Sequence, residues 1–178
     1  LATLRDDGVI VLEPAEGRLA EGYAGKGRLP GPDEILALAE LALHQRTGRL
    51  TGKQIIVSAG GTVEPIDPVR FITNRSSGKM GYAIAQAAAE QGANVTLVTS
   101  SDLPAPAGVQ TVHIQSAREL LAAMTERFET ADAVIMAAAV SDYRVATPAD
   151  QKMKKDAANP GLTLELVENP DILATLGA

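Results

Sequence analysis

The residues whose types and spacing suggest chemistry lie in one stretch, VSAGGTVEPIDPVRFITNRSSGKMGY, residues 57–82. An apolar run, residues 54–58, ends in a glycine pair, and a long polar loop then leads to Gly78-Lys79. Free backbone N–H groups in a glycine-rich loop and at a helix start attract anions. The stretch therefore predicts a nucleotide phosphate site. Its predicted lining is Ser58, Gly60, Gly61, Thr62, Ser76, Ser77, Gly78 and Lys79.

The loop differs from the two commonest phosphate-binding motifs. A dinucleotide fold has a tight turn that reads G-x-G-x-x-G, whereas here a long loop separates Gly61 from the next helix. The G-x-x-x-x-G-K-[ST] motif is also absent, because Met80 follows Gly78-Lys79. A loop of this length can wrap a triphosphate and still leave side chains for chemistry.

Several segments resemble one family. The segments SAGGT, EPIDPVRFITNRSSGKMG, MAAAVSDYR, QKMKK and ENPDILATLG are similar to the phosphopantothenoylcysteine synthetase half of the bifunctional coenzyme A biosynthesis protein. The resemblance runs from about Thr51 to Ala178. It implies CTP-dependent ligation of 4′-phosphopantothenate to L-cysteine through an acyl-cytidylate. Mg²⁺ is implied with the triphosphate.

The resemblance also implies residue roles. Asn74 matches an asparagine that holds the acyl-cytidylate, although a loop asparagine can simply satisfy backbone groups. Lys152 matches a lysine that binds the cytidine nucleotide, and Lys154 is its neighbour. Asn74 and Lys152 are therefore the expected catalytic residues. Arg70 and Arg75 would reach a substrate phosphate across the interface of a homodimer.

A second set of implied contacts follows the run MAAAV. The family reads cytosine largely through the backbone here, which corresponds to Ala138, Ala139 and Val140. Asp142 matches an aspartate that contacts the nucleotide and is a plausible metal ligand. Ser141 stands where the family commonly has alanine.

The first part of the chain resembles the other half of the same family. Residues 1–45 are similar to the end of the flavin-dependent decarboxylase domain, including its substrate clamp. Many members have a cysteine there, but this chain reads Leu19-Ala20-Glu21-Gly22. We expect FMN only in a parent decarboxylase domain, and no independent decarboxylase activity here. Residues 46–53 are predicted to be a linker, and residues 54–178 an incomplete ligase domain.

Alternating strand and helix patterns place these motifs on an α/β fold. Strands are predicted at 54–58, 94–99, 109–114 and 133–139, with helices at 79–91 and 116–128. This order favours a Rossmann-like, doubly wound parallel sheet ordered 3-2-1-4, C-terminally truncated. The glycine loop and residues 139–144 would then meet where the strand order reverses.

Flanking patterns are weaker. We expect a strand at 8–12, a turn at 13–17, an irregular flap at 21–28, a helix at 33–44 and an edge strand at 162–167. Asn169-Pro170-Asp171 has the order of a helix cap, a first-position proline and a first-turn acid.

Composition narrows the classes of partner. A net charge of −6 and a pI near 4.9 argue against nucleic acid and basic membrane patches. The sequence has no cysteine, which excludes a disulfide framework or a thiolate metal site. Without a signal or spanning segment in the sequence given, a cytoplasmic protein is expected.

Two other functions stay open. Asp102 after the second strand is compatible with a nicotinamide-binding oxidoreductase domain, although the missing glycine fingerprint opposes this. The chain is also compatible with a nucleotide-binding module that does not turn over alone.

Overall fold

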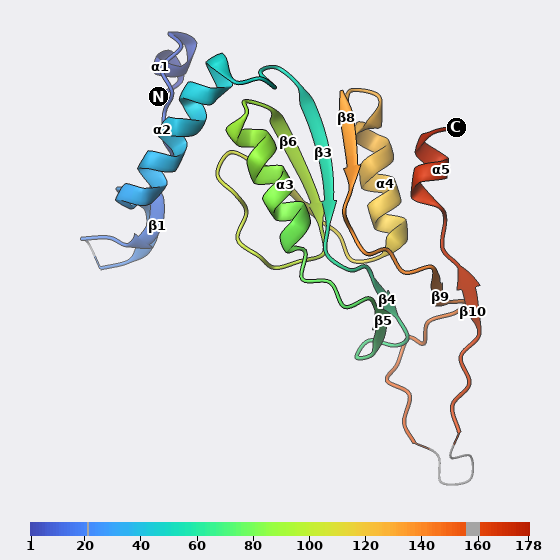
Figure 1. The fold of residues 1–178 in the computed structure, drawn as a ribbon. Helices are drawn as coiled ribbons and strands as arrows, with labels where there is room; N and C mark the ends of the chain where they lie inside the picture. The colour runs from blue at the N-terminus through green and yellow to red at the C-terminus, as the bar shows by residue number, and fades with distance from the viewer. Residues whose placement is uncertain (21, 156–160) are drawn as a thin grey trace.

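The computed structural model describes residues 1–20, 22–155 and 161–178, apart from the side chain of Arg46. At its centre lies a parallel sheet of β3 (Gln54–Ala59), β6 (Asn94–Thr99), β7 (Gln110–His113) and β8 (Ala133–Met136). The strand order is β7-β6-β3-β8 (Figure 1). The predicted α/β class and the 3-2-1-4 order are therefore confirmed, although β7 and β8 are shorter than predicted.

Helices cover both faces of this sheet. On one face, α3 (Lys79–Glu90) and α2 (Pro32–Thr47) pack in a core that includes Val57 and Leu97. On the other face, α4 (Ala117–Phe128) and α5 (Ile172–Leu176) pack around Ile56 and Val98. Neighbouring strand residues enter opposite cores because successive side chains point to opposite faces. The molecule is thus a three-layer α/β/α structure (Figure 1).

The start of α4 is fastened to the loop that follows β3. Ser116 Oγ accepts a hydrogen bond from Glu119 N–H, and Glu119 Oε2 accepts one from Gln115 N–H at 2.7 Å. Ser116 and Glu119 have the spacing of a capping box, and here the Glu119 carboxylate binds the N–H of the residue before the cap. Glu64 of β4 (Val63–Pro65) adds a further contact, because its buried Oε1 accepts a hydrogen bond from Ala117 N–H at 2.9 Å. This contact links β4 to the helix.

Two short antiparallel pairs lie beyond the sheet. β4 pairs with β5 (Phe71–Thr73) inside the segment that the sequence predicts only as a polar loop. β9 (Tyr143–Val145) pairs with β10 (Leu166–Glu168), so the edge strand predicted at 162–167 is present but shorter and displaced. Between β9 and β10 the described chain, residues 146–155 and 161–165, runs out from the body as an extended arm (Figure 1).

Three predictions for the N-terminal part are wrong. The strand expected at 8–12 is absent, and Val9 and Ile10 are exposed. Where a turn and a flap were expected, β1 (Ala15–Arg18) and β2 (Ala24–Arg28) form a hairpin after the short helix α1 (Ala2–Asp6). Main-chain hydrogen bonds hold such a ribbon, so a glycine-rich sequence can form it. Glu21 of the predicted clamp lies outside the described residues.

The cap predicted for the last helix is also wrong. Asp171, not Asn169, is the N-cap of α5, and its Oδ1 accepts a hydrogen bond from Ala174 N–H at 2.9 Å. Asn169 instead donates from Nδ2 to the carbonyl of Ser141 at 2.8 Å. Among the helices of the described residues, none is long and apolar enough to cross a membrane.

Candidate nucleotide site

Two buried hydroxyl groups fix the carboxyl ends of β3 and β8 against each other. Ser58 Oγ accepts hydrogen bonds from the N–H groups of Ala137 and Ala138, both at 3.1 Å. Thr62 Oγ1 accepts one from Ser141 N–H at 2.9 Å. Ser58 is 0% exposed and Thr62 is 1% exposed. The structure therefore places both in the framework beneath the site, and not on the cavity surface where the sequence analysis expected them.

The glycine pair continues this junction. Gly60 O accepts a hydrogen bond from Ala139 N–H at 2.7 Å, and Thr62 N–H donates to Ala139 O at 3.3 Å. Gly61 and Ala139 form a parallel bridge between the segments that follow β3 and β8. The glycine loop and the run MAAAV, which are far apart in sequence, therefore meet where the strand order reverses, as predicted.

Asn74 lies over the same junction. Its Nδ2 donates to the carbonyl of Val140 at 3.0 Å and to that of Ala139 at 3.4 Å. These two acceptors fix which way the side-chain amide points. Its Oδ1 has no hydrogen-bond partner among the residues described, and the residue is exposed. Asn74 can therefore hold the strand end and bind a ligand at the same time.

The first turn of α3 offers backbone donors. Gly78 is the N-cap, with φ of 76°, a left-handed conformation that favours glycine, and no side chain caps this end. N–H groups of a first helical turn have no partner within the helix and attract anions. Ser76, Ser77 and Lys79 are exposed beside it.

Gly81 sets how closely this helix approaches β3. A Cβ atom at Gly81 would lie 2.5 Å from the Cβ of Ala59 and 2.7 Å from the carbonyl oxygen of Ser58. Only glycine fits this contact without movement of the helix. The close approach brings the start of α3 to the carboxyl end of the strand, where the predicted phosphate site lies.

A cavity of about 640 Å³ opens between the end of β8 and the start of α5. Ala138, Val140 and Asp142 line it, together with residues 168–173 at the start of α5. Asp142 is exposed, and its carboxylate makes no hydrogen bond or ion pair with the described part of the chain. The cavity therefore places an available carboxylate beside the backbone of β8.

The described residues contain no group of His, Cys, Asp or Glu that could hold a metal ion by itself. A single carboxylate, Asp142, nevertheless fits Mg²⁺ that arrives on a triphosphate. Mg²⁺ usually keeps several waters and is bound through one or two carboxylates plus substrate phosphates.

The lysines predicted to bind the nucleotide lie away from this cavity. Lys152 and Lys154 are exposed and do not line the 640 Å³ cavity. Between them, the backbone of Met153 is bound to Asp67 and Arg70 in the turn between β4 and β5. Arg70 is thus engaged within its own chain, which the sequence analysis did not expect.

Asp67 was missed from the sequence. It is 4% exposed, and its carboxylate accepts hydrogen bonds from the side chain and backbone of Arg70. The guanidinium hydrogen bonds hold the pKa of Asp67 well below its ordinary value, with a smaller contribution from backbone N–H groups. The only signal in the sequence is the Asp-Pro-x-Arg spacing, which suits an Asx-type turn.

A second cavity, of about 820 Å³, lies by the carboxyl ends of β6 and β7. Asp102 and His113 line it, together with residues of the β4–β5 hairpin. The position of Asp102 after β6 had suggested only a nicotinamide site.

The model of the DNA/pantothenate metabolism flavoprotein C-terminal domain family matches residues 50–178. The chain belongs to this family. A crystal structure of the C-terminal domain of coenzyme A biosynthesis bifunctional protein CoaBC is similar, with 45% identity and a TM-score of 0.61. It covers 72% of this chain and 59% of that one. The DNA/pantothenate metabolism flavoprotein from Streptococcus pneumoniae is 27% identical, with a TM-score of 0.60 over 70% of this chain and 64% of that chain.

Members of this flavoprotein family resemble the chain over almost all of its length. The coenzyme A biosynthesis bifunctional protein CoaBC of Mycobacterium tuberculosis is 51% identical over 98% of this chain and 43% of its own. That of Bacillus subtilis is 45% identical over 99% of this chain and 44% of its own. The chain therefore spans less than half the length of these relatives.

Proposed function

We propose that this chain carries a site for the CTP-dependent ligation of 4′-phosphopantothenate to L-cysteine, a step of coenzyme A biosynthesis. Membership of the flavoprotein C-terminal domain family supports the pathway, because relatives at 45–51% identity are named for coenzyme A biosynthesis. The observation that carries the proposal is the contact of Asn74 Nδ2 with Val140 O at 3.0 Å. That contact joins the glycine loop to the end of β8.

The proposed reaction has two steps. A carboxylate oxygen of 4′-phosphopantothenate attacks the α-phosphorus of CTP, and pyrophosphate leaves. The cysteine amine then attacks the acyl carbon, loses a proton, and displaces CMP. Neither step requires a nucleophile from the protein, so a site of hydrogen-bond donors is sufficient.

The chain's own residues have separable roles in this proposal. The backbone N–H groups at the start of α3 bind phosphate oxygens, and the backbone of residues 138–140 reads cytosine. Asn74 holds the acyl-cytidylate through its Oδ1, which has no partner in the described part of the chain. Asp142 would hold Mg²⁺, which supplies charge neutralisation on the triphosphate when bound. Lys152 and Lys154 close over the nucleotide as cations.

Three further features stay proposals. The family resemblance favours a homodimer through the ligase domain, in which Arg75 approaches a substrate of the other subunit. It favours FMN in a decarboxylase domain of the parent protein only. It also favours a cytoplasmic enzyme.

Pyrophosphate release tests the proposal. The natural protein is incubated with CTP, Mg²⁺ and 4′-phosphopantothenate, before and after addition of cysteine. We expect release that depends on phosphopantothenate, and an amide product that depends on cysteine. In Asn74→Ala, the product should fall by at least about tenfold, because removal of one polar group that contacts the transition state commonly has an effect of this size or more.

Ser77→Ala changes another residue of the predicted phosphate lining and should have a smaller effect, because the Ser77 side chain makes no hydrogen bond within the described residues. Thermal stabilisation by CTP without turnover would support a binding module instead. A response to NADH and none to CTP would overturn the proposal.

A further inference from the structure

The base of the arm is attached to the turn between β4 and β5. Ala149 N–H donates to the carbonyl of Ile66 at 2.9 Å. Met153 N–H donates to Asp67 Oδ2 at 3.1 Å, and Arg70 Nη2 donates to Met153 O at 2.9 Å. The N–H and the carbonyl of Met153 are therefore both bound by the ion pair of Asp67 and Arg70.

The two carboxylate oxygens of Asp67 bind different groups. Oδ1 accepts hydrogen bonds from the N–H groups of Val69 and Arg70, both at 2.9 Å, and so closes the turn. Oδ2 accepts from Arg70 Nε at 2.9 Å, from Arg70 Nη2, and from Met153 N–H. The turn alone needs only Oδ1. Oδ2 binds the Arg70 guanidinium and the N–H of Met153, and so makes the contact with the arm.

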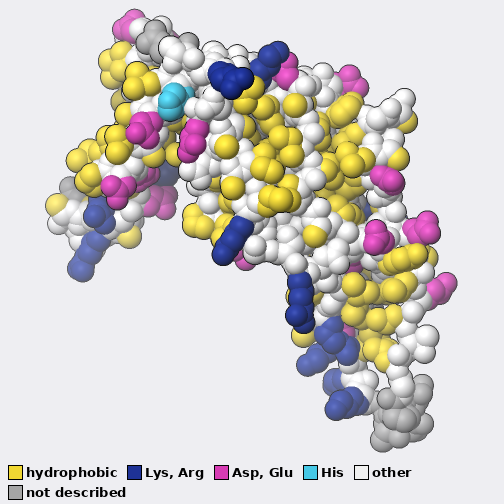
Figure 2. Space-filling model, in the orientation of Figure 1, with side chains coloured by type: hydrophobic (Ala, Val, Ile, Leu, Met, Phe, Trp, Pro, Cys, Tyr) yellow, Lys and Arg dark blue, Asp and Glu magenta, His cyan; other side chains and the backbone are white. Residues whose placement is uncertain are grey.

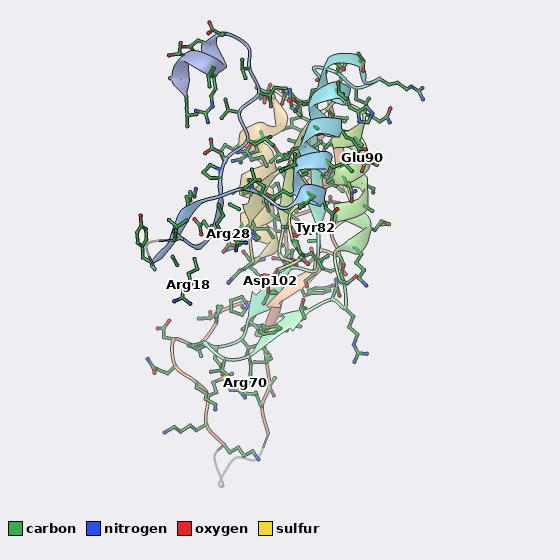
Figure 3. All side chains as sticks on the ribbon, turned by 90° about the vertical axis from the view of Figure 1, so that its left-hand side faces the viewer. Arg18, Arg28, Arg70, Tyr82, Glu90 and Asp102 are labelled. Atoms are coloured by element: carbon green, nitrogen blue, oxygen red, sulfur yellow. The ribbon has the colours of Figure 1, made fainter. Side chains whose placement is uncertain are left out.

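This contact lies inside the cluster of lysines. Lys152 and Lys154 flank Met153, and both are exposed. In Figure 2, Lys and Arg side chains gather at this lower end of a molecule whose net charge is −6. Figure 3 shows Arg70 at the same end, beside the arm. A fixed Met153 backbone therefore limits where the two ammonium groups can reach.

We infer that Asp67 is a positioning residue, whose carboxylate fixes the backbone of Met153 and thereby aims Lys152 and Lys154 at the triphosphate of the nucleotide. The inference rests on the proposed function, because it assigns the lysines to CTP. Long lysine side chains lose conformational entropy on binding. A backbone that is already ordered lowers this cost.

Asp67→Asn separates the two oxygens. The asparagine carbonyl can take the place of Oδ1 and keep the turn closed, because Asx turns accept either residue. Its NH₂ group then faces the N–H donors of Arg70 and Met153, where no hydrogen bond can form. Asp132→Asn is the matched control, since Asp132 also accepts hydrogen bonds from a basic side chain, that of Lys53, and from a backbone N–H, that of Gln54.

The first measurement needs no nucleotide. Trypsin cuts after lysine, so the rate of cleavage at Lys152 and Lys154 reports how well the segment is held. We expect Asp67→Asn to accelerate cleavage at these sites by about tenfold or more, because cleavage follows the population of the opened segment. Asp132→Asn should leave the rate unchanged. An unchanged rate in Asp67→Asn would overturn the inference, whatever the ligand.

The second measurement is a double-mutant cycle on CTP binding by titration calorimetry. Asp67→Asn should weaken CTP binding by about tenfold, which corresponds to about 1.4 kcal/mol. In a Lys152→Ala/Lys154→Ala background, the same change should have less than about a twofold effect, because its target is gone. An effect of equal size in both backgrounds would mean a general structural role and would overturn the inference.

Met153→Pro provides a second variant if Asp67→Asn fails to fold. Proline removes the N–H that binds Oδ2 and leaves the pair of Asp67 and Arg70 intact. It should reproduce the weaker CTP binding and the faster cleavage after Lys154. Cleavage after Lys152 is not a readout in this variant, because trypsin does not cut a Lys–Pro bond. Gln151→Pro is its control, because Gln151 N–H makes no hydrogen bond within the described residues. If CTP binds none of the proteins while trypsin sensitivity changes as expected, the proposed function fails and the attachment stands.

Discussion

Ser58 and Ser141 are buried serines at the same junction with opposite hydrogen-bonding states. Ser58 Oγ accepts from two backbone N–H groups, whereas Ser141 Oγ has no partner among the described residues. A buried polar group without a partner destabilises the folded state by about 1–3 kcal/mol, and its removal relieves that cost. Removal of the two hydroxyls should therefore change the free energy of unfolding in opposite directions.

We predict that Ser141→Ala raises the free energy of unfolding by about 0.5–1 kcal/mol, and that Ser58→Ala lowers it by about 2 kcal/mol. The second change leaves the N–H groups of Ala137 and Ala138 buried without an acceptor. Urea unfolding of both variants measures the difference. Equal effects would show that the Ser141 hydroxyl has a hydrogen-bond partner after all.

At the scale of elements, α3 and β3 form the contact that presents the glycine loop. Gly81 makes it possible, since a Cβ there would lie 2.5 Å from Ala59 Cβ. Helix propensity alone would make Gly81→Ala stabilising by about 0.8–1 kcal/mol. Forcing an additional carbon into a packed contact costs about 1–3 kcal/mol. The two effects have opposite signs.

We predict that packing wins and that Gly81→Ala lowers the free energy of unfolding by about 1 kcal/mol. The temperature of thermal unfolding and the affinity for CTP should both fall, because the start of α3 would move away from the end of β3. Ala87→Gly on the exposed face of α3 is the control. It should lower stability through propensity alone and leave CTP binding unchanged. A more stable Gly81→Ala would contradict the packing argument.

At the scale of the whole molecule, two carboxylates connect distant segments and set the response to acid. Asp67 joins the β4–β5 turn to the arm, and Asp132 joins the start of β8 to Lys53 and Gln54. Hydrogen bonds from Arg70 lower the pKa of Asp67, and those from Lys53 lower the pKa of Asp132. Both carboxylates are therefore ionised in the folded protein across neutral pH.

A lowered pKa stabilises the folded state above the unfolded value, which is about 3.9 for aspartate. That contribution disappears as pH falls through the lower pKa of the folded state. We predict that Asp67→Asn is less stable than the parent by a constant amount above about pH 5, and that the difference narrows below about pH 4. Urea unfolding between pH 3 and 7 measures it. A difference that widens with acid would contradict the assignment.

Local patterns predicted the central sheet well. Apolar runs at 54–58 and 94–99 and the order of strands and helices were sufficient for the fold class. They failed for the hairpins, because β1, β2, β4 and β5 are held by main-chain pairing that leaves little trace in side-chain periodicity. They also misplaced the N-cap of α5, because the Asn169 side chain donates a hydrogen bond to the carbonyl of Ser141 instead of capping the helix.

The sequence by itself determined the parallel α/β fold, the position of the glycine loop and its meeting with the segment that begins at Ala139. These follow from short-range hydrophobic patterns and from the geometry of parallel sheets. Only the tertiary structure decided which polar residues are framework and which are available. Ser58 and Thr62 are buried supports, Asn74 bridges to β8, and Asp67 holds Met153. A hydrogen bond between residues far apart in sequence depends on how the chain packs, and no local pattern encodes it.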